Sequence, residues 1–124
     1  MEGLLYKDES YGIIGVLFEV YNHLGFGFSE IVYKDAIQHE FSSLKIPFQR
    51  EKEFSVKYKG IKLPHKFYAD FVVHNNIILE IKSVESIHDK HVSQCLNYLK
   101  VSGLRLAILA NFHKDLLDYR RIVL

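Results

Sequence analysis

Hydrophobic residues in the first part of the chain recur every three or four positions, which predicts helices. The spacing predicts a first helix over residues 10–24, ended by the glycines at 25–27, and a second helix from an N-cap at Ser29 to about Leu44. The positions expected to face a core are Ile13, Ile14, Leu17, Val20, Tyr21 and Leu24 in the first helix, and Val32, Ala36, Ile37, Phe41 and Leu44 in the second.

After Pro47 the hydrophobic period changes to two, which predicts β-strands. The turn-forming pair Lys59-Gly60 predicts one hairpin, and His74-Asn75-Asn76 tolerates the left-handed turn of a second. The strand segments expected here are residues 54–58, 61–63, 68–73 and 77–82. We therefore expect four antiparallel strands.

Helical spacing returns over residues 89–102, with Gly103 as the C-terminal cap. The continuous apolar run 106–110 predicts a strand buried on both faces, reached by a right-handed crossover through that helix. Residues 121–124 predict a short last strand. This order of elements predicts an α/β sandwich with a mixed sheet.

Composition limits the classes of protein to consider. The 124 residues fit one domain spanning 1–124, and a net charge of +1 provides no overall field for nucleic acid or membranes, so an anion site must be local. One cysteine, acidic residues within Met1–Glu9 and no apolar run long enough to span a bilayer predict a cytoplasmic protein without a membrane partner.

Three ionisable residues interrupt strands that otherwise look like core: Asp70, Glu80 and Lys82. Buried charges are costly unless they are paired or bound to a metal, and strand alternation puts Glu80 and Lys82 on one face. A three-residue loop at 74–76, or a bulge, pairs Asp70 with Glu80, whereas a two-residue loop turns Asp70 away, and we expect the first arrangement. Two such carboxylates suit a hard divalent cation, but a buried acid bonded to Lys82 explains the spacing equally well.

Several motifs together resemble the PD-(D/E)XK nuclease superfamily, and within it the small bacterial and archaeal GxxExxY branch. They are Gly27-Phe28-Ser29-Glu30-Ile31-Val32-Tyr33, Tyr58-Lys59-Gly60, Ala69-Asp70, Glu80-Ile81-Lys82, Gln94-Cys95-Leu96-Asn97-Tyr98-Leu99, Asn111-Phe112 and Arg120-Arg121-Ile122-Val123. Phe26 and His113 depart from residues common in that branch, and neither is an expected ligand. The resemblance implies a restriction-endonuclease-like three-layer sandwich with a mixed central β-sheet flanked by helices.

The resemblance also implies site residues. Asp70, Glu80, the backbone carbonyl of Ile81 and, as an additional acidic ligand, Glu30 would hold Mg²⁺ or Mn²⁺, while Lys82 would orient the attacking water or neutralise charge on the phosphate. Glu30 has a second interpretation, as an acid that stabilises the helix N-terminus. Gln94 and Tyr98 share a helix face and would lie near the active site, or form a solvated polar stripe.

A basic hairpin without acids is the expected nucleic-acid contact. Its basic residues are Lys57, Lys59, Lys62, His65 and Lys66, and Arg120 is a candidate second point. The lysines could instead protect a sheet edge from aggregation. A zinc site at His88, His91 and Cys95 has no evident fourth ligand, so its signal is weak.

These observations favour a metal-dependent nuclease acting on nucleic acid, with DNA expected. Because many nucleases of this fold that cut both DNA strands are dimers, the resemblance also implies a homodimer. The alternative from another class is a catalytically silent nucleic-acid-binding or interaction module of the same fold.

Overall fold

The computed structural model describes residues 4–124, so the first residues of the acidic N-terminal stretch, 1–3, lie outside it. The elements in chain order are α1 (Lys7–Leu24), α2 (Glu30–Ser43), β1 (Phe48–Tyr58), β2 (Ile61–Val73), β3 (Ile77–Lys82), α3 (Asp89–Ser102), β4 (Leu106–Asn111) and β5 (Asp118–Val123). Among the described residues, no helix has both the length and the apolar character needed to cross a membrane.

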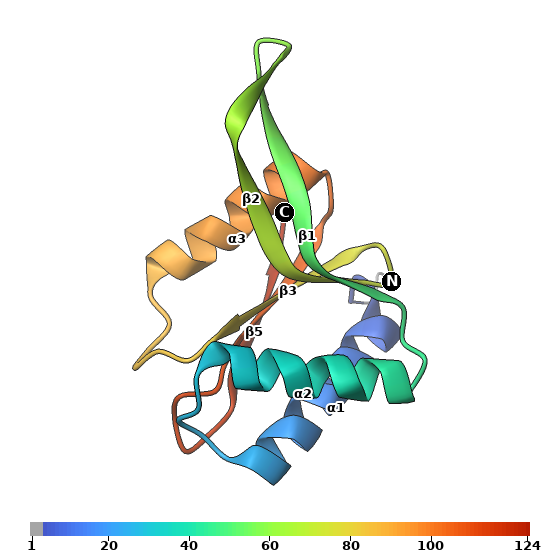
Figure 1. The fold of residues 1–124 in the computed structure, drawn as a ribbon, viewed down its shortest axis with the longest axis vertical. Helices are drawn as coiled ribbons and strands as arrows, with labels where there is room; N and C mark the ends of the chain where they lie inside the picture. The colour runs from blue at the N-terminus through green and yellow to red at the C-terminus, as the bar shows by residue number, and fades with distance from the viewer. Residues whose placement is uncertain (1–3) are drawn as a thin grey trace.

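The strands form one mixed sheet in the order β1-β2-β3-β4-β5. β3 and β4 are parallel, connected through α3, and the other neighbouring pairs are antiparallel. Figure 1 shows α1 and α2 together on one side of the sheet and α3 on the other. The expected three-layer α/β sandwich with a mixed sheet is confirmed.

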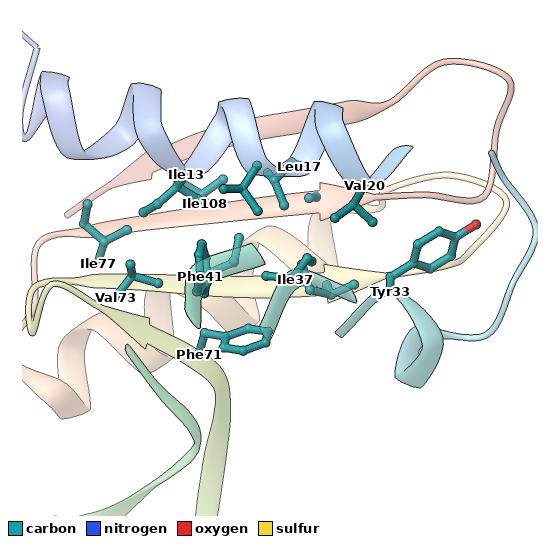
Figure 2. Close-up of a cluster of buried hydrophobic side chains, with 14 of the residues drawn as sticks. Ile13, Leu17, Val20, Tyr33, Ile37, Phe41, Phe71, Val73, Ile77 and Ile108 are labelled. Carbon is teal, nitrogen blue, oxygen red and sulfur yellow. The ribbon is translucent and has the colours of Figure 1, made fainter. Parts of the chain in front are cut away.

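Two buried clusters lie on the two faces of the sheet. The larger packs α1 and α2 against the sheet, and Figure 2 shows Ile13, Leu17 and Val20 of α1 above Phe41, Ile37 and Tyr33 of α2. The smaller packs Cys95 and Leu99 of α3 against the opposite face. β3 and β4 are buried nearly throughout because helices cover both of their faces.

The expected four antiparallel strands are wrong, because residues 61–63 and 68–73 belong to one strand, β2. Pro64 does not break this strand because it lies in a register shift, where three residues of β2 stand opposite Val56 of β1. A proline in such a bulge removes no ladder hydrogen bond.

Smaller corrections concern element ends. α2 ends at Ser43, so Leu44 is exposed rather than core-facing. Ser29 occupies the N-cap position of α2, but its side chain makes no capping hydrogen bond. The last strand begins at Asp118, three residues before the expected start, because it pairs along the whole of β4.

Candidate functional site

The loop between β2 and β3 sets the register that the candidate site needs. Val73 pairs with Ile77 and Phe71 with Leu79, and this register continues to Asp70 opposite Glu80. His74 and Asn75 adopt positive φ angles of 55° and 61°, which allow the three-residue loop. The expected three-residue loop is confirmed.

The β1–β2 pair bends at the same point. Ala69 packs on the α3 side of the sheet and Phe71 on the α1–α2 side, although residues two apart normally share a face. Opposite Asp70 in β1, Glu51 has a φ of 54° and makes no ladder pair. The pairing of β2 with β3 ends at Phe71, and Figure 1 shows the two-stranded ribbon leaving the sheet. The bend therefore frees the edge of β3 beside Glu80.

Side-chain hydrogen bonds replace the missing ladder at this edge. The Asp70 N–H donates to Glu80 Oε2 at 2.6 Å, and the Ile81 N–H donates to Asp70 Oδ2 at 2.8 Å. Because the N–H and C=O of one strand residue point to the same neighbouring strand, the Ile81 carbonyl also faces the position that β2 has left. Two carboxylates and one carbonyl are thus gathered along one short edge.

Glu80 is a buried acid with a strongly raised pKa. Its side chain is 3% exposed, beneath α3. Burial raises the pKa of Glu80 from 4.5, and the Asp70 charge raises it further, to about 8, against the opposing effects of the Asp70 N–H, Lys82 and Lys34. The pair therefore carries a repulsion that a bound cation would remove.

This pKa predicts the pH dependence of stability in the absence of metal. Above its ordinary pKa of 4.5, Glu80 is ionised in the unfolded chain but keeps its proton in the folded chain until about pH 8, so the free energy of unfolding falls over this interval. Glu80→Gln cannot ionise, and its Tm is expected to exceed that of the wild type by about 4 °C or more near pH 9, equivalent to ~1 kcal/mol, and to match it near pH 5. Thermal melts in EDTA across this range measure the effect.

Glu53→Gln is the matched control because Glu53 is exposed on β1, where it bonds Lys66 and the Tyr68 hydroxyl at the surface. It should not become more stable than the wild type at high pH. A Glu80→Gln protein that is less stable than the wild type near pH 9 would contradict the assignment.

Lys34 of α2 is a site residue that the sequence analysis missed. Its ammonium lies 2.9 Å from Asp70 Oδ1 and also bonds Glu51, and its side chain is 11% exposed. Burial lowers the pKa of Lys34, but the hydrogen bonds to Glu51 and Asp70 outweigh burial and the net shift is upward. Helical spacing carried a signal, because Lys34 precedes the buried Ile37 by three residues and therefore lies on the same side of its helix.

Lys82 and Glu30 lie toward the end of β3. Within residues 4–124, no acidic side chain pairs with Lys82, so its ammonium stays available beside Glu80. Glu30 at the start of α2 accepts a hydrogen bond from the Ser83 N–H at 3.3 Å. It therefore lies next to the residue that follows Lys82, without a hydrogen bond to the Asp70–Glu80 pair.

Tyr33 fixes the loop that precedes Glu30. Its hydroxyl donates to the Gly25 carbonyl at 2.8 Å and accepts from the Phe28 N–H at 3.1 Å, while its ring stacks on Phe112 at 4.3 Å. The ring is fully buried, so Tyr33 packs and positions rather than reacts.

Gln94 and Tyr98 lie on α3, which covers Glu80. Tyr98 packs more deeply than a polar stripe requires, since its ring stacks on Phe67 of β2 at 4.2 Å. Burial and the nearby Glu80 charge raise the pKa of Tyr98 to about 12. Gln94 is half-buried on the turn before Tyr98.

The basic residues divide into two groups. Lys57, Lys59 and Lys62 lie at the far end of the β1–β2 ribbon, whereas Lys66 pairs with Glu53 at 3.3 Å. Arg120 pairs in register with Leu109, which packs on the α3 face. Arg120 therefore shares the face of Glu80. The neighbouring Arg121 lies on the other face and donates to the Leu5 carbonyl.

The weak zinc signal at His88, His91 and Cys95 gains no support. His91 Nδ1 accepts a hydrogen bond from the His88 N–H at 2.9 Å, and burial raises the pKa of the Cys95 thiol to about 12. In residues 4–124, no three His, Cys, Asp or Glu side chains gather closely enough to hold a metal by themselves. The chain thus offers a hard cation two carboxylates, Asp70 and Glu80, whose all-oxygen chemistry suits Mg²⁺ or Mn²⁺ with water completing the shell.

Comparisons with known proteins bear on the fold and the family of this chain. A solved structure titled "Crystal structure of SSO0001" is similar with a TM-score of 0.61 and 20% identity, over 77% of this chain and 50% of the other, so this chain spans half the length of that one. That likeness supports the restriction-endonuclease-like fold. No curated protein gives a significant match. A family model described as the PD-(D/E)XK nuclease superfamily, whose members typically use divalent metals, matches residues 7–122. Because the match covers nearly the whole sequence, the chain belongs to the PD-(D/E)XK nuclease superfamily.

Proposed function

We propose that this protein is a metal-dependent nuclease that hydrolyses phosphodiester bonds of DNA. The observation that carries the proposal is the Asp70–Glu80 pair at the freed edge of β3, with the Lys82 ammonium, which pairs with no acid among residues 4–124, next to it. Phosphodiester hydrolysis needs charge stabilisation on the phosphoryl oxygens and an aligned water, and a metal held by two carboxylates supplies both.

The proposed roles follow the geometry. Asp70, Glu80 and the Ile81 carbonyl hold the cation, and Lys82 neutralises the phosphate or orients the attacking water. Glu30, which accepts a hydrogen bond from the Ser83 N–H, is proposed as an additional acidic ligand of the cation, directly or through water. Lys34 keeps Asp70 in place from the α2 side, which leaves Lys82 for the substrate.

Gln94, on the helix that covers Glu80, is proposed to contact the substrate or orient Lys82. Tyr98 and Arg120 are proposed nucleic-acid contacts because they also lie on the α3 side of the sheet. Lys57, Lys59, Lys62 and Lys66 complete the proposed nucleic-acid contacts.

The family branch, the domain, the location and the oligomeric state of the protein are proposals as well. The motifs in their order along the chain support membership of the GxxExxY branch and one nuclease domain over residues 1–124. We also propose that the protein works in the cytoplasm on DNA, as a homodimer. The single cysteine supports a reducing compartment, since Cys95 is free and buried.

The test is cleavage of labelled linear, nicked, flapped and branched DNAs and matched RNAs with Mg²⁺ or Mn²⁺. We expect cutting that stops in EDTA and falls at least ~100-fold in Lys82→Ala, while Lys90→Ala, a matched exposed lysine on α3, stays near the wild type. Metal-independent, salt-sensitive binding without cutting on any substrate would instead identify the silent binding module.

A further inference from the structure

Among residues 4–124, the distal half of the β1–β2 hairpin pairs with no third strand, although its base packs against α3 through Phe67 and Tyr98. β2 pairs with β3 only at residues 71–73, so beyond the bend at Glu51 and Asp70 the two strands pair only with each other. Figure 1 shows this ribbon projecting well past the rest of the sheet. Seven residue steps separate Glu51 from Tyr58, which at about 3.3 Å per residue places the tip about 23 Å from the carboxylate pair.

The two faces of the tip differ in chemistry. Tyr58 stands directly opposite Ile61, and Lys57 directly opposite Lys62. Since cross-strand partners share a face and successive residues alternate, one face is apolar and the other carries two ammonium groups. Tyr58 and Ile61 are 57% and 64% exposed and belong to neither buried cluster of the described chain, although the Lys59 ammonium lies 5.5 Å from the centre of the Tyr58 ring.

The lysine face is unfavourable for the protein alone. Like charges directly opposite each other destabilise a strand pair, and within residues 4–124 no acid pairs with Lys57 or Lys62. Lys57 also lines a hollow of about 380 Å³ between the ribbon and α3, together with Lys100. A polyanion removes this repulsion, whereas the tip of a second copy brings the same lysine pair and adds to it.

We propose that the tip of the β1–β2 hairpin is a second contact with duplex DNA, so that the substrate is a duplex extending about seven base pairs to one side of the bond that is cut. Seven base pairs follow from the 23 Å reach and the 3.4 Å rise of DNA. A two-stranded ribbon fits the major groove with its Tyr58–Ile61 face against the bases, and the long, flexible side chains of Lys57 and Lys62 extend past the ribbon edges to the phosphates on either side. The inference rests on the proposed function, because the distance is counted from the proposed catalytic carboxylates.

The experiment measures binding without turnover, by fluorescence anisotropy in EDTA. The probes are a linear duplex of about 24 base pairs and a hairpin-capped duplex of about six, which is too short to reach the tip. For Lys57→Ala/Lys62→Ala we expect the long duplex to bind about tenfold more weakly and the affinity for the short duplex to change less than twofold. On the long duplex, the slope of log K against log salt concentration should become shallower by about 2. For Tyr58→Ala/Ile61→Ala we expect a similar loss on the long duplex with an unchanged slope.

Lys7→Ala/Lys45→Ala is the matched control because it removes the same charge from exposed positions outside the hairpin. It should change neither probe by more than twofold. Wild-type-like affinity and salt slope in both tip variants would overturn the inference. So would a dimer, seen by sedimentation, that Tyr58→Ala/Ile61→Ala dissociates while binding per protomer stays unchanged.

The two proposals fail separately. If the protein cuts no substrate but its binding of the long duplex depends on the tip, the second DNA contact is supported and the nuclease proposal fails. If the protein is a metal-dependent nuclease but the tip variants bind DNA like the wild type, the nuclease proposal is supported and the second contact fails.

Discussion

Asp70→Asn is expected to lower cleavage about 1,000-fold or more and to remove the rise in Tm that Mg²⁺ or Mn²⁺ gives the wild type. Both carboxylate oxygens of Asp70 are committed at the site, one to Lys34 and one to the Ile81 N–H. The amide retains the shape but loses the charge that holds the cation, and with it the stabilisation of charge on the phosphate. Because binding to the folded state alone raises Tm, the metal response reports the site even without a known substrate.

Asp35→Asn is the matched control for Asp70→Asn. Asp35 also pairs with a cation of the α2–β1 region, Arg50, but it is exposed, and this pair involves neither Asp70 nor Glu80. Its variant should keep both activity and the metal response. An Asp70→Asn protein that folds and still cuts within tenfold of the wild-type rate would place the metal elsewhere.

Lys34→Met is expected to lower the free energy of unfolding by about 2–3 kcal/mol in EDTA, with a fall in Tm of roughly 10 °C. Removing one partner of a fully buried ion pair costs about 3–5 kcal/mol, and we expect less here because Glu51 is half exposed. The loss leaves Asp70 beside Glu80 without its nearest cation, so saturating Mg²⁺ should stabilise Lys34→Met more than it stabilises the wild type. Thermal melts with and without Mg²⁺ measure both effects.

Arg50→Met provides the comparison for Lys34→Met. Arg50 bridges to exposed Asp35 and to Gln38, so its loss should cost less than about 1 kcal/mol and leave the Mg²⁺ response unchanged. Equal destabilisation of the two variants, or no extra Mg²⁺ effect in Lys34→Met, would show that Lys34 does not neutralise the carboxylate pair.

The prediction of two separate strands over residues 61–73 was wrong because a local sequence pattern does not show how a strand pairs with its neighbour. Residues 61–63 and 68–73 look like separate strands because Pro64 and the polar residues after it interrupt the alternation. The register shift opposite Val56 absorbs the interruption, and it exists only through pairing with β1. Likewise, the half-buried ring of Tyr98 stacks on Phe67, which lies in another element and is 31 residues away along the chain.

The order of residues was enough to predict the helical and strand periods and the ends of α3 at Asp89 and Ser102, and it narrowed the β2–β3 connection to two loop lengths, of which the three-residue one is present. These follow from short-range preferences of the backbone and from side-chain alternation. Only the tertiary structure decided the bend at Glu51 and the pairing of Lys34 with Asp70, 36 residues apart. It also decided the raised pKa of Glu80, because burial and the charge of a neighbouring strand are set by packing between elements and not by the order of residues along one of them.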